Sequence, residues 1–183
     1  PLINAVPGLE LSVVASRDAA KVHADLPHAQ VIADPLEAIR RPEVDLVVIA
    51  SPNDTHAPLA LAALEAGKHV VVDKPFTLDL AQARTLIAAA EKHERLLSVF
   101  QNRRWDSDYL GVKQVIEQGL IGKVTHFESH IDRYRPEVRV RWREQNLPGS
   151  GLWFDLGPHM VDQALQLFGL PHSVQANIAT LRP

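Results

Sequence analysis

The stretch HVVVDKPFTLDLAQARTLIAAA, residues 69–90, places an apolar run, a charged turn and a helical pattern directly after one another. The three valines at 70–72 have no polar residue between them, which is typical of a strand buried on both faces of a sheet. Residues 73–75 (DKP) end this strand, and the alanine-rich residues 79–93 have the periodicity of a helix. A buried strand that leads into a helix is the repeating unit of a parallel α/β sheet.

The same unit recurs through the first hundred residues. Further apolar runs predict strands at 9–15, 31–32, 46–50 and 96–100. Helical patterns lie between them at 17–25, 35–41 and 56–66, and Gly67 stands where a helix-ending glycine is expected. We therefore predict an α/β domain with a parallel sheet that helices cover on both faces.

A second pattern begins after residue 104. We predict a helix over 107–118 that Gly119 ends, and a longer strand over 123–134. A polar loop, a second helix and a second strand should follow, at 135–151, 152–168 and 173–181. We expect two incomplete domains, 1–102 and 103–183, with the chain ending inside the α+β sheet of the second.

Composition excludes several classes of protein. The chain has 183 residues, 46% of them hydrophobic, and a net charge of −3, which gives no reason to expect nucleic-acid or membrane partners. It contains no cysteine, so disulfides, thiolate metal sites and cysteine nucleophiles are absent. No apolar run is long enough to cross a bilayer, and no signal peptide is recognisable. We expect a cytoplasmic protein whose N-terminal start is missing.

Three predicted strands end in polar sequences, at 15–18 (ASRD), 51–56 (SPNDTH) and 73–75 (DKP). Ligands of open parallel sheets bind at the carboxyl ends of the strands, so these three ends on one sheet edge predict a binding site. The alternative is that each is a polar turn that starts a helix. The candidate N-caps are Ser16, Asp54, Thr55 and Asp79.

Lys74 stands at the end of a buried strand, with a proline after it. Desolvation favours the neutral amine, which makes such a lysine usable as an acid or base near neutral pH. Pro75 restricts the backbone and so restricts where the amine points. The alternative is a surface lysine paired with Asp73.

The segment GSGLWFDLGPHMVD, residues 149–162, places Asp155 four residues before His159. On a helix the two share a face, and a carboxylate that orients a histidine selects its tautomer and raises its basicity. Asp162 could lie on the same side. The alternative is a surface Asp/His pair.

The predicted strand at 123–134 allows a metal-binding interpretation. His126, Glu128, His130 and Asp132 alternate along it, so they would point to one face, and such a set could bind zinc. No further histidine stands at a helical spacing to complete an open catalytic site. We therefore predict no metal site.

Taken in order, SPNDTH, DKP, QNRRWD, WRE and GSGLWFDLGPHMVD resemble the glucose–fructose oxidoreductase and inositol dehydrogenase (Gfo/Idh/MocA) family. The resemblance runs from about residue 2 to residue 183. It implies a Rossmann-like domain followed by a second domain, and NAD(P)-dependent oxidation or reduction of sugars, polyols or related alcohols and ketones. It also implies a homo-oligomer, dimer or tetramer, and a cis peptide bond between Lys74 and Pro75.

The resemblance also implies roles for single residues. Lys74 matches the lysine of the family's Glu-Lys-Pro motif, and Asp155 and His159 match its Asp-x-x-x-His pair, so these three are the expected catalytic residues. The expected cofactor-binding residues are Ser51, Pro52, Asn53, His56, Asp73, Lys74, Pro75, Asn102, Arg103, Trp142 and Arg143. Ser16 and Arg17, at the end of the predicted strand 9–15, would favour the 2′-phosphate of NADP over NAD, unless Asp18 reaches the ribose instead.

The sequence departs from the family pattern in two places. It has Asp-Lys-Pro in place of Glu-Lys-Pro, and it has no Gly-x-Gly-x-x-Gly turn. We therefore expect a fragment of a protein of about 340 residues, two domains of ordinary size. The alternative function is a non-catalytic nucleotide-binding sensor on the same scaffold. Such a sensor would not need Lys74, Asp155 and His159 together.

Overall fold

The computed structural model describes residues 3–132, 134, 136–137 and 141–179. Backbone contacts divide the chain into two compact units, residues 1–99 and 100–183. None of the helices in the described part of the chain is long and apolar enough to cross a membrane.

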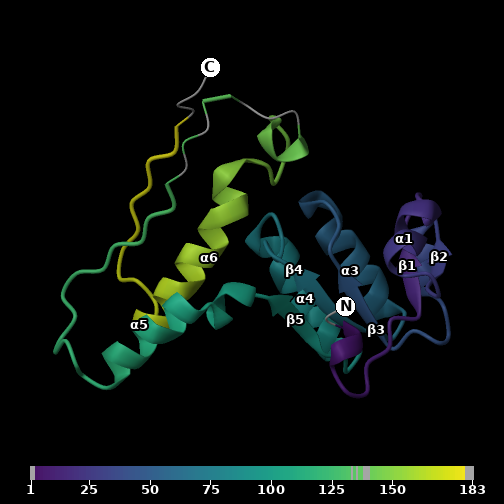
Figure 1. Ribbon diagram of the computed structural model, residues 1–183, viewed down its shortest axis with the longest axis horizontal. Coiled ribbons are helices and arrows are strands. Elements are labelled where there is room, and N and C mark those ends of the chain that lie inside the picture. Colours follow the sequence, from purple (N-terminus) through teal and green to yellow (C-terminus); the bar gives the residue numbers. More distant parts are fainter. Residues whose placement is uncertain (1–2, 133, 135, 138–140, 180–183) are drawn as a thin grey trace. The chain divides into compact units, whose positions relative to one another are not determined.

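The first unit alternates strands and helices along the chain, as predicted (Figure 1). After a short 3-10 turn, η1 (Ile3–Ala5), the elements are β1 (Val13–Ala15), α1 (Ala19–Asp25), β2 (Gln30–Ile32), α2 (Pro35–Ile39), β3 (Leu46–Ile49), η2 (Asn53–Thr55), α3 (His56–Glu65), β4 (His69–Asp73), α4 (Leu80–Lys92) and β5 (Leu97–Phe100).

Side-chain caps decide where α1 and α4 begin. Asp79 accepts a hydrogen bond from the Gln82 backbone N–H at 2.8 Å, which confirms it as the N-cap of α4. Asp18 caps α1 in the same way through the Lys21 N–H, so this helix begins at Ala19 rather than at the predicted residue 17. The predicted caps Asp54 and Thr55 make no such bond to α3.

The pairs β1–β2 and β3–β4 are parallel, but the strands form two sheets instead of the single sheet that we predicted. β1 pairs with β2, while β3, β4 and β5 form the other sheet in that order. In a doubly wound sheet, the strand that leads into the glycine-rich turn lies between these two groups. This sequence contains no such turn, so the two groups have no common strand to join them.

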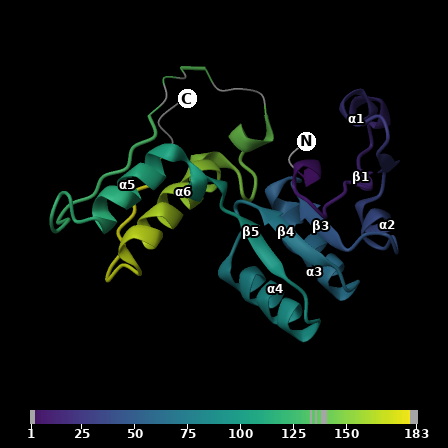
Figure 2. The same ribbon diagram turned by 60° about the horizontal axis from the view of Figure 1, so that its bottom comes forward.

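The core lies between the larger sheet and two helices. Val70 and Val72 of β4 and Ile49 of β3 are buried against α3 and α4, which pack against each other. Figure 2 shows both helices on one side of this sheet. Val48 points to the other face and is 48% exposed, so the prediction that helices cover both faces is wrong for this part of the sheet.

The described residues of the second unit form two predicted helices and two short turns. The helices are α5 (Ser107–Glu117) and α6 (Gly151–Phe168), and the turns are η3 (Asn102–Trp105) and η4 (Trp142–Glu144). Gly119 has a φ of +67°, the left-handed conformation that suits a glycine after a helix. The turn η4 lies in a stretch that we predicted as irregular loop.

The two strands predicted for the second unit are not formed in the described residues, which have no strand at 119–132 or 169–179. A strand is stable only when a neighbour accepts and donates its backbone hydrogen bonds, and the described residues of 123–132 and 170–179 make no such bond to another described segment. Both segments are drawn as coil in Figure 1, and Phe127 contacts the ring of Phe168 with centroids 5.2 Å apart. Residues 133, 135 and 180–181 of these predictions lie outside the described part.

Candidate active site

The carboxyl end of β3 continues into a tight turn. The Thr55 hydroxyl donates to the carbonyl of Pro52 at 2.7 Å and lies 2.5 Å from the hydroxyl of Ser51. The Thr55 backbone N–H bonds to the same carbonyl, and Asn53 is buried inside the turn. The turn leads directly into α3, so the backbone between strand and helix is closely held, as an anion-binding turn before a helix N-terminus requires.

The carboxyl end of β4 lies beside this turn, because β3 and β4 are neighbours with Ile49 paired to Val72. The peptide bond between Lys74 and Pro75 is cis, which confirms the expectation from the family resemblance. Asp73 accepts the backbone N–H of Lys74 through Oδ1 at 2.7 Å. The two strand ends that carry SPNDTH and DKP therefore share one edge of the sheet.

His56 connects these two strand ends. Its ring is 1% exposed, with Nδ1 2.8 Å from the carbonyl oxygen of Pro75 and Nε2 3.0 Å from that of Ser51. The ring is thus enclosed by protein, although the resemblance implied that it lines the cofactor. Its contacts are those of a residue that holds two loops in place.

The third predicted strand end, after β1, belongs to the other sheet. The Ser16 hydroxyl accepts the backbone N–H of Asp18 at 3.1 Å, while the carboxylate of Asp18 caps α1. Arg17 is exposed. The helix cap is therefore Asp18, and Ser16 and Arg17 precede it at the strand end.

In the second unit, the turn η3 is attached to α6. Arg104 donates two hydrogen bonds to the carboxylate of Asp162, at 2.7 and 2.6 Å, and Gln163 donates to the carbonyl of Arg103 at 3.0 Å. The side chain of Arg103 pairs with Asp106 at 2.9 Å. Sequence reasoning missed Arg104, because nothing local in NRRWD distinguishes it from its neighbour.

This ion pair changes the titration of the groups around it. The hydrogen bond to Asp162 raises the pKa of the Arg104 guanidinium, so its charge is retained throughout the accessible pH range. Burial raises the pKa of the nearby Tyr109 hydroxyl, and the negative charge of Asp162 raises it further.

The helix α6 brings several predicted site residues together. Asp155 and His159 lie one turn apart on it, with His159 only 5% exposed. Arg143 of η4 approaches Asp155, with Nε 3.7 Å from Oδ1, and its guanidinium stacks 4.7 Å above the ring of Trp142. The Trp-Arg pair and the Asp-x-x-x-His pair therefore form one cluster.

The packing of α6 also explains Gly157, which lies between Asp155 and His159. A Cβ on Gly157 would lie 2.7 Å from Cε3 of Trp153, which is closer than a carbon contact allows. Only glycine fits at this position without moving the indole ring.

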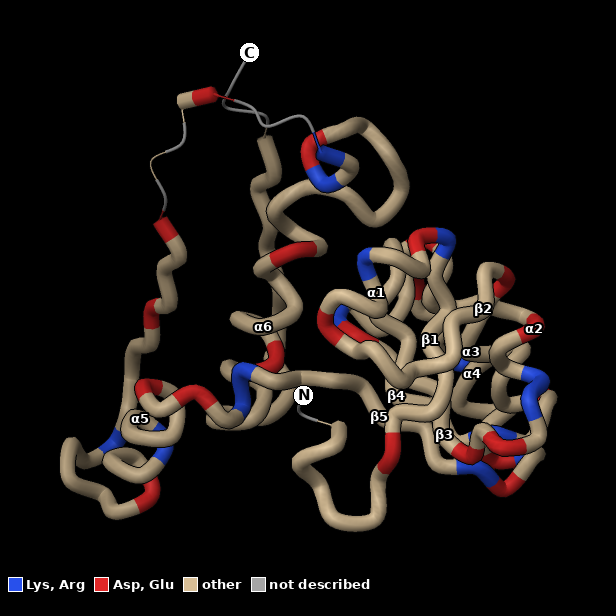
Figure 3. The backbone as a smooth tube through the Cα atoms, turned by 45° about the vertical axis from the view of Figure 1, so that its right-hand side comes forward, with Lys and Arg blue, Asp and Glu red and all other residues tan. Residues whose placement is uncertain are grey.

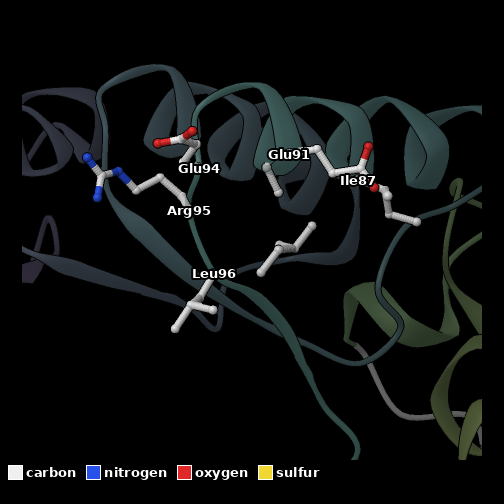
Figure 4. A pocket seen from close by; sticks show the side chains of 7 residues that line it. Ile87, Glu91, Glu94, Arg95 and Leu96 are labelled. Carbon is white, nitrogen blue, oxygen red and sulfur yellow. The ribbon is translucent and has the colours of Figure 1, made fainter.

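Other features of the chain do not add to the site. Figure 3 shows acidic and basic residues interspersed over the first unit rather than gathered by sign. A shallow recess where α4 ends and β5 begins lies at the amino end of β5, away from the carboxyl edge. Figure 4 shows its labelled lining residues: Ile87, Glu91, Glu94, Arg95 and Leu96.

The zinc interpretation finds no support in the described residues, where no three or more His, Asp or Glu side chains are arranged so that they could hold a metal ion. Glu128 instead lies between two histidines, 3.0 Å from Nε2 of His126 and 3.4 Å from Nε2 of His130. These hydrogen bonds lower the pKa of the Glu128 carboxyl.

Comparison with known proteins agrees with this architecture. Residues 1–101 match a family profile described as "Oxidoreductase family, NAD-binding Rossmann fold", and residues 109–183 match the "GFO/IDH/MocA C-terminal domain". The uncharacterized oxidoreductase YdgJ of Escherichia coli is 58% identical over the whole chain, which covers 53% of that protein.

Two further proteins match the whole of this chain with about half of their own length. The scyllo-inositol 2-dehydrogenase (NADP(+)) IolW of Bacillus subtilis is 37% identical over all of this chain and 51% of its own. The solved structure of an oxidoreductase candidate from Klebsiella pneumoniae is 69% identical, with a TM-score of 0.90 over all of this chain and 49% of that one. The chain spans about half the length of these proteins.

The NAD-binding profile covers more than half of the chain, and the C-terminal profile covers most of the rest. The chain belongs to the Gfo/Idh/MocA oxidoreductase family.

Proposed function

We propose that the whole protein is an NAD(P)-dependent dehydrogenase or reductase, which transfers hydride between the nicotinamide and a sugar, polyol or related alcohol or ketone. The observation that carries this proposal is the shared edge of β3 and β4, where a closely held turn before a helix lies beside Lys74. Relatives named inositol 2-dehydrogenase (Rhodococcus jostii) and levoglucosan dehydrogenase (Pseudarthrobacter phenanthrenivorans) support the substrate class.

Three side chains of this chain would handle the proton and the charge. In the oxidising direction His159 takes the hydroxyl proton, and Asp155 steadies the ring. Lys74 binds the same oxygen and stabilises the negative charge that develops on it. A bound nicotinamide would supply the acceptor for the hydride that leaves the substrate carbon. In the reducing direction His159 or Lys74 returns the proton.

The cofactor would be held by residues from both units. The turn after β3, the DKP segment, η3 and the Trp-Arg pair supply Ser51, Pro52, Asn53, Asp73, Pro75, Asn102, Arg103, Trp142 and Arg143. NADP is preferred over NAD in this proposal. Asp18 is used as the cap of α1, and the exposed Arg17, beside Ser16 at the strand end, would meet a 2′-phosphate. One relative carries NADP(+) in its name.

The domain boundary, the cellular location and the oligomeric state belong to the same proposal. We place the domain boundary after residue 102, the protein in the cytoplasm, and the whole protein in a homo-oligomer. A non-catalytic sensor is the second candidate, but the presence of Lys74, Asp155 and His159 together favours an enzyme.

The test uses the full-length protein, NAD⁺ or NADP⁺, and a panel of sugars and polyols, with nicotinamide absorbance as the readout. We expect turnover with at least one substrate, and a loss of about a hundredfold or more in kcat for His159→Ala, since a general base is removed. His23→Ala, on α1, is the control that keeps its activity. Nucleotide binding without turnover on any substrate of the panel would favour the sensor.

The same mechanism makes a structural prediction. In a structure of the full-length protein with dinucleotide bound, Lys74, Asp155 and His159 should line one cleft at the carboxyl edge of the sheet. Finding Lys74 and His159 on opposite sides of the molecule would end the mechanism.

A further inference from the structure

The contacts of His56 bear on which of its ring nitrogens carry a proton. Both ring nitrogens lie within hydrogen-bond distance of backbone carbonyl oxygens, at 2.8 Å for Nδ1 and 3.0 Å for Nε2. A carbonyl oxygen only accepts hydrogen bonds. A neutral imidazole has one N–H, so one nitrogen would turn its lone pair toward a carbonyl oxygen, whereas the imidazolium donates at both nitrogens.

We propose that His56 is a positioning residue of the cofactor site, held as the imidazolium, which joins the carbonyls of Ser51 and Pro75 through two N–H donors. We refer to these two hydrogen bonds as the His56 bridge. The ring is 1% exposed, so water cannot replace either carbonyl as a partner.

The His56 bridge joins the two loops that the proposed function uses. Ser51 precedes the turn that is expected to line the cofactor, and Pro75 follows Lys74 directly. The bridge therefore sets the distance between the cofactor-lining turn and the proposed catalytic lysine. This role rests on the proposed function, whereas the protonation state of the ring does not.

The charged groups around the ring leave the two carbonyls as its partners. The segments that hold it carry Asp54, which is exposed, Asp73, whose Oδ1 accepts the backbone N–H of Lys74, and the half-buried Lys74 itself. The charged side chains of α2 and α4, which pack on α3, are exposed: Glu37, Arg84, Glu91 and Lys92. Among the described residues no carboxylate bonds to the ring, so the two carbonyl dipoles stabilise its charge.

His69 provides an internal reference. Its Nδ1 accepts a hydrogen bond from the backbone N–H of Leu96 at 2.9 Å. A nitrogen that accepts carries no proton, so this ring is the neutral tautomer with its proton on Nε2. The same protein thus contains one histidine that the geometry assigns as doubly protonated and one that it assigns as singly protonated.

The direct test is ¹⁵N NMR of the full-length protein with labelled histidine, at neutral pH and without cofactor. Each ring is assigned through its backbone connectivities, so no variant is needed. We expect two protonated nitrogens for His56, and one protonated and one unprotonated nitrogen for His69. A single protonated nitrogen on His56 would overturn the proposal.

The kinetic test compares wild type, His56→Gln and the control His23→Gln, which alters an exposed histidine on α1. We expect the KM for dinucleotide to rise about tenfold in His56→Gln while kcat changes less, because a charged hydrogen bond between the two loops is lost. His23→Gln should keep the wild-type KM. An unchanged KM in His56→Gln would refute the positioning role.

The two tests separate this proposal from the proposed function. If no substrate of the panel is turned over, the proposed function fails, while the NMR result still decides the protonation of His56. Dinucleotide affinity, measured by titration, then replaces KM as the readout of the positioning role.

Discussion

At the scale of single residues, the pKa of the Tyr109 hydroxyl is raised, and absorbance can measure this directly. It is 7% exposed and lies beside the ion pair of Arg104 and Asp162. Burial raises the pKa of its hydroxyl and the negative charge of Asp162 adds to this, while the positive charge of Arg104 acts in the opposite direction.

Tyr109 should therefore lose its proton at a higher pH than an ordinary tyrosine. The measurement is the tyrosinate absorbance of the full-length protein during an alkaline titration, with Tyr109→Phe subtracted. In Asp162→Asn the raising charge is gone and the charge of Arg104 remains, so the Tyr109 titration should move to lower pH. An unchanged titration in this variant would show that burial alone is responsible.

The cofactor preference also depends on single residues. Arg17 is exposed at the end of β1, and Asp18 is used as a helix cap. For Arg17→Ala we expect kcat/KM with NADP⁺ to fall about tenfold, since a charge-assisted contact to phosphate is lost, while kcat/KM with NAD⁺ changes little. Steady-state kinetics with both cofactors measure this. A wild-type preference for NAD⁺ would contradict the assignment.

At the scale of elements, α6 connects the segments of the second unit that carry predicted site residues. It carries Asp155 and His159, and it is attached to η3 by Asp162 and Gln163 in its next turn. Its position therefore follows from contacts between segments 58 and 60 residues apart in sequence.

Two glycines in helices provide a matched test of how tightly α6 packs. In Gly157→Ala the new methyl group would meet the Trp153 ring, and such overpacking costs about 1–3 kcal/mol of the free energy of unfolding. In Gly111→Ala, on α5, the new methyl group would meet no atom within 4 Å apart from its chain neighbours and the local helix backbone, so the higher helix propensity of alanine should stabilise by up to about 1 kcal/mol.

Thermal unfolding of both variants in the full-length protein measures this difference. Opposite shifts of the melting temperature are expected, downward for Gly157→Ala and upward for Gly111→Ala. Equal shifts in the two variants would mean that the indole ring moves aside without cost.

At the scale of the whole molecule, the first unit consists of two separate sheets. β1–β2 and β3–β4–β5 share no strand, and Val48 is half exposed on the larger sheet. The sequence contains no Gly-x-Gly-x-x-Gly turn, whose backbone N–H groups would hold a dinucleotide diphosphate.

The 183-residue chain on its own should therefore bind NAD(P) weakly, at least tenfold more weakly than the full-length protein, since this diphosphate site is absent from it. Calorimetric titration of both proteins with NADP⁺ measures the difference. Tight, stoichiometric binding by the chain alone would show that β3, β4 and their turns suffice.

The sequence determined those parts of the protein that depend on neighbouring residues. The valine run at 70–72 predicted β4, the alanine-rich pattern predicted α4, and Asp79 is its cap. Helical periodicity located α5 and α6, and the ordered motifs predicted the family. These predictions succeed because a helix makes its hydrogen bonds within itself, and because a cap acts within one turn.

Only the tertiary structure decided which distant groups meet. His56 reaches the carbonyl of Pro75 and Arg104 reaches Asp162, and neither partner is visible in the local sequence. The segments 123–134 and 173–181 have strand-like composition, yet their described residues form no strand. The reason is that a strand or a buried polar group is stable only with a partner, and the path of the chain in three dimensions determines which partner is within reach.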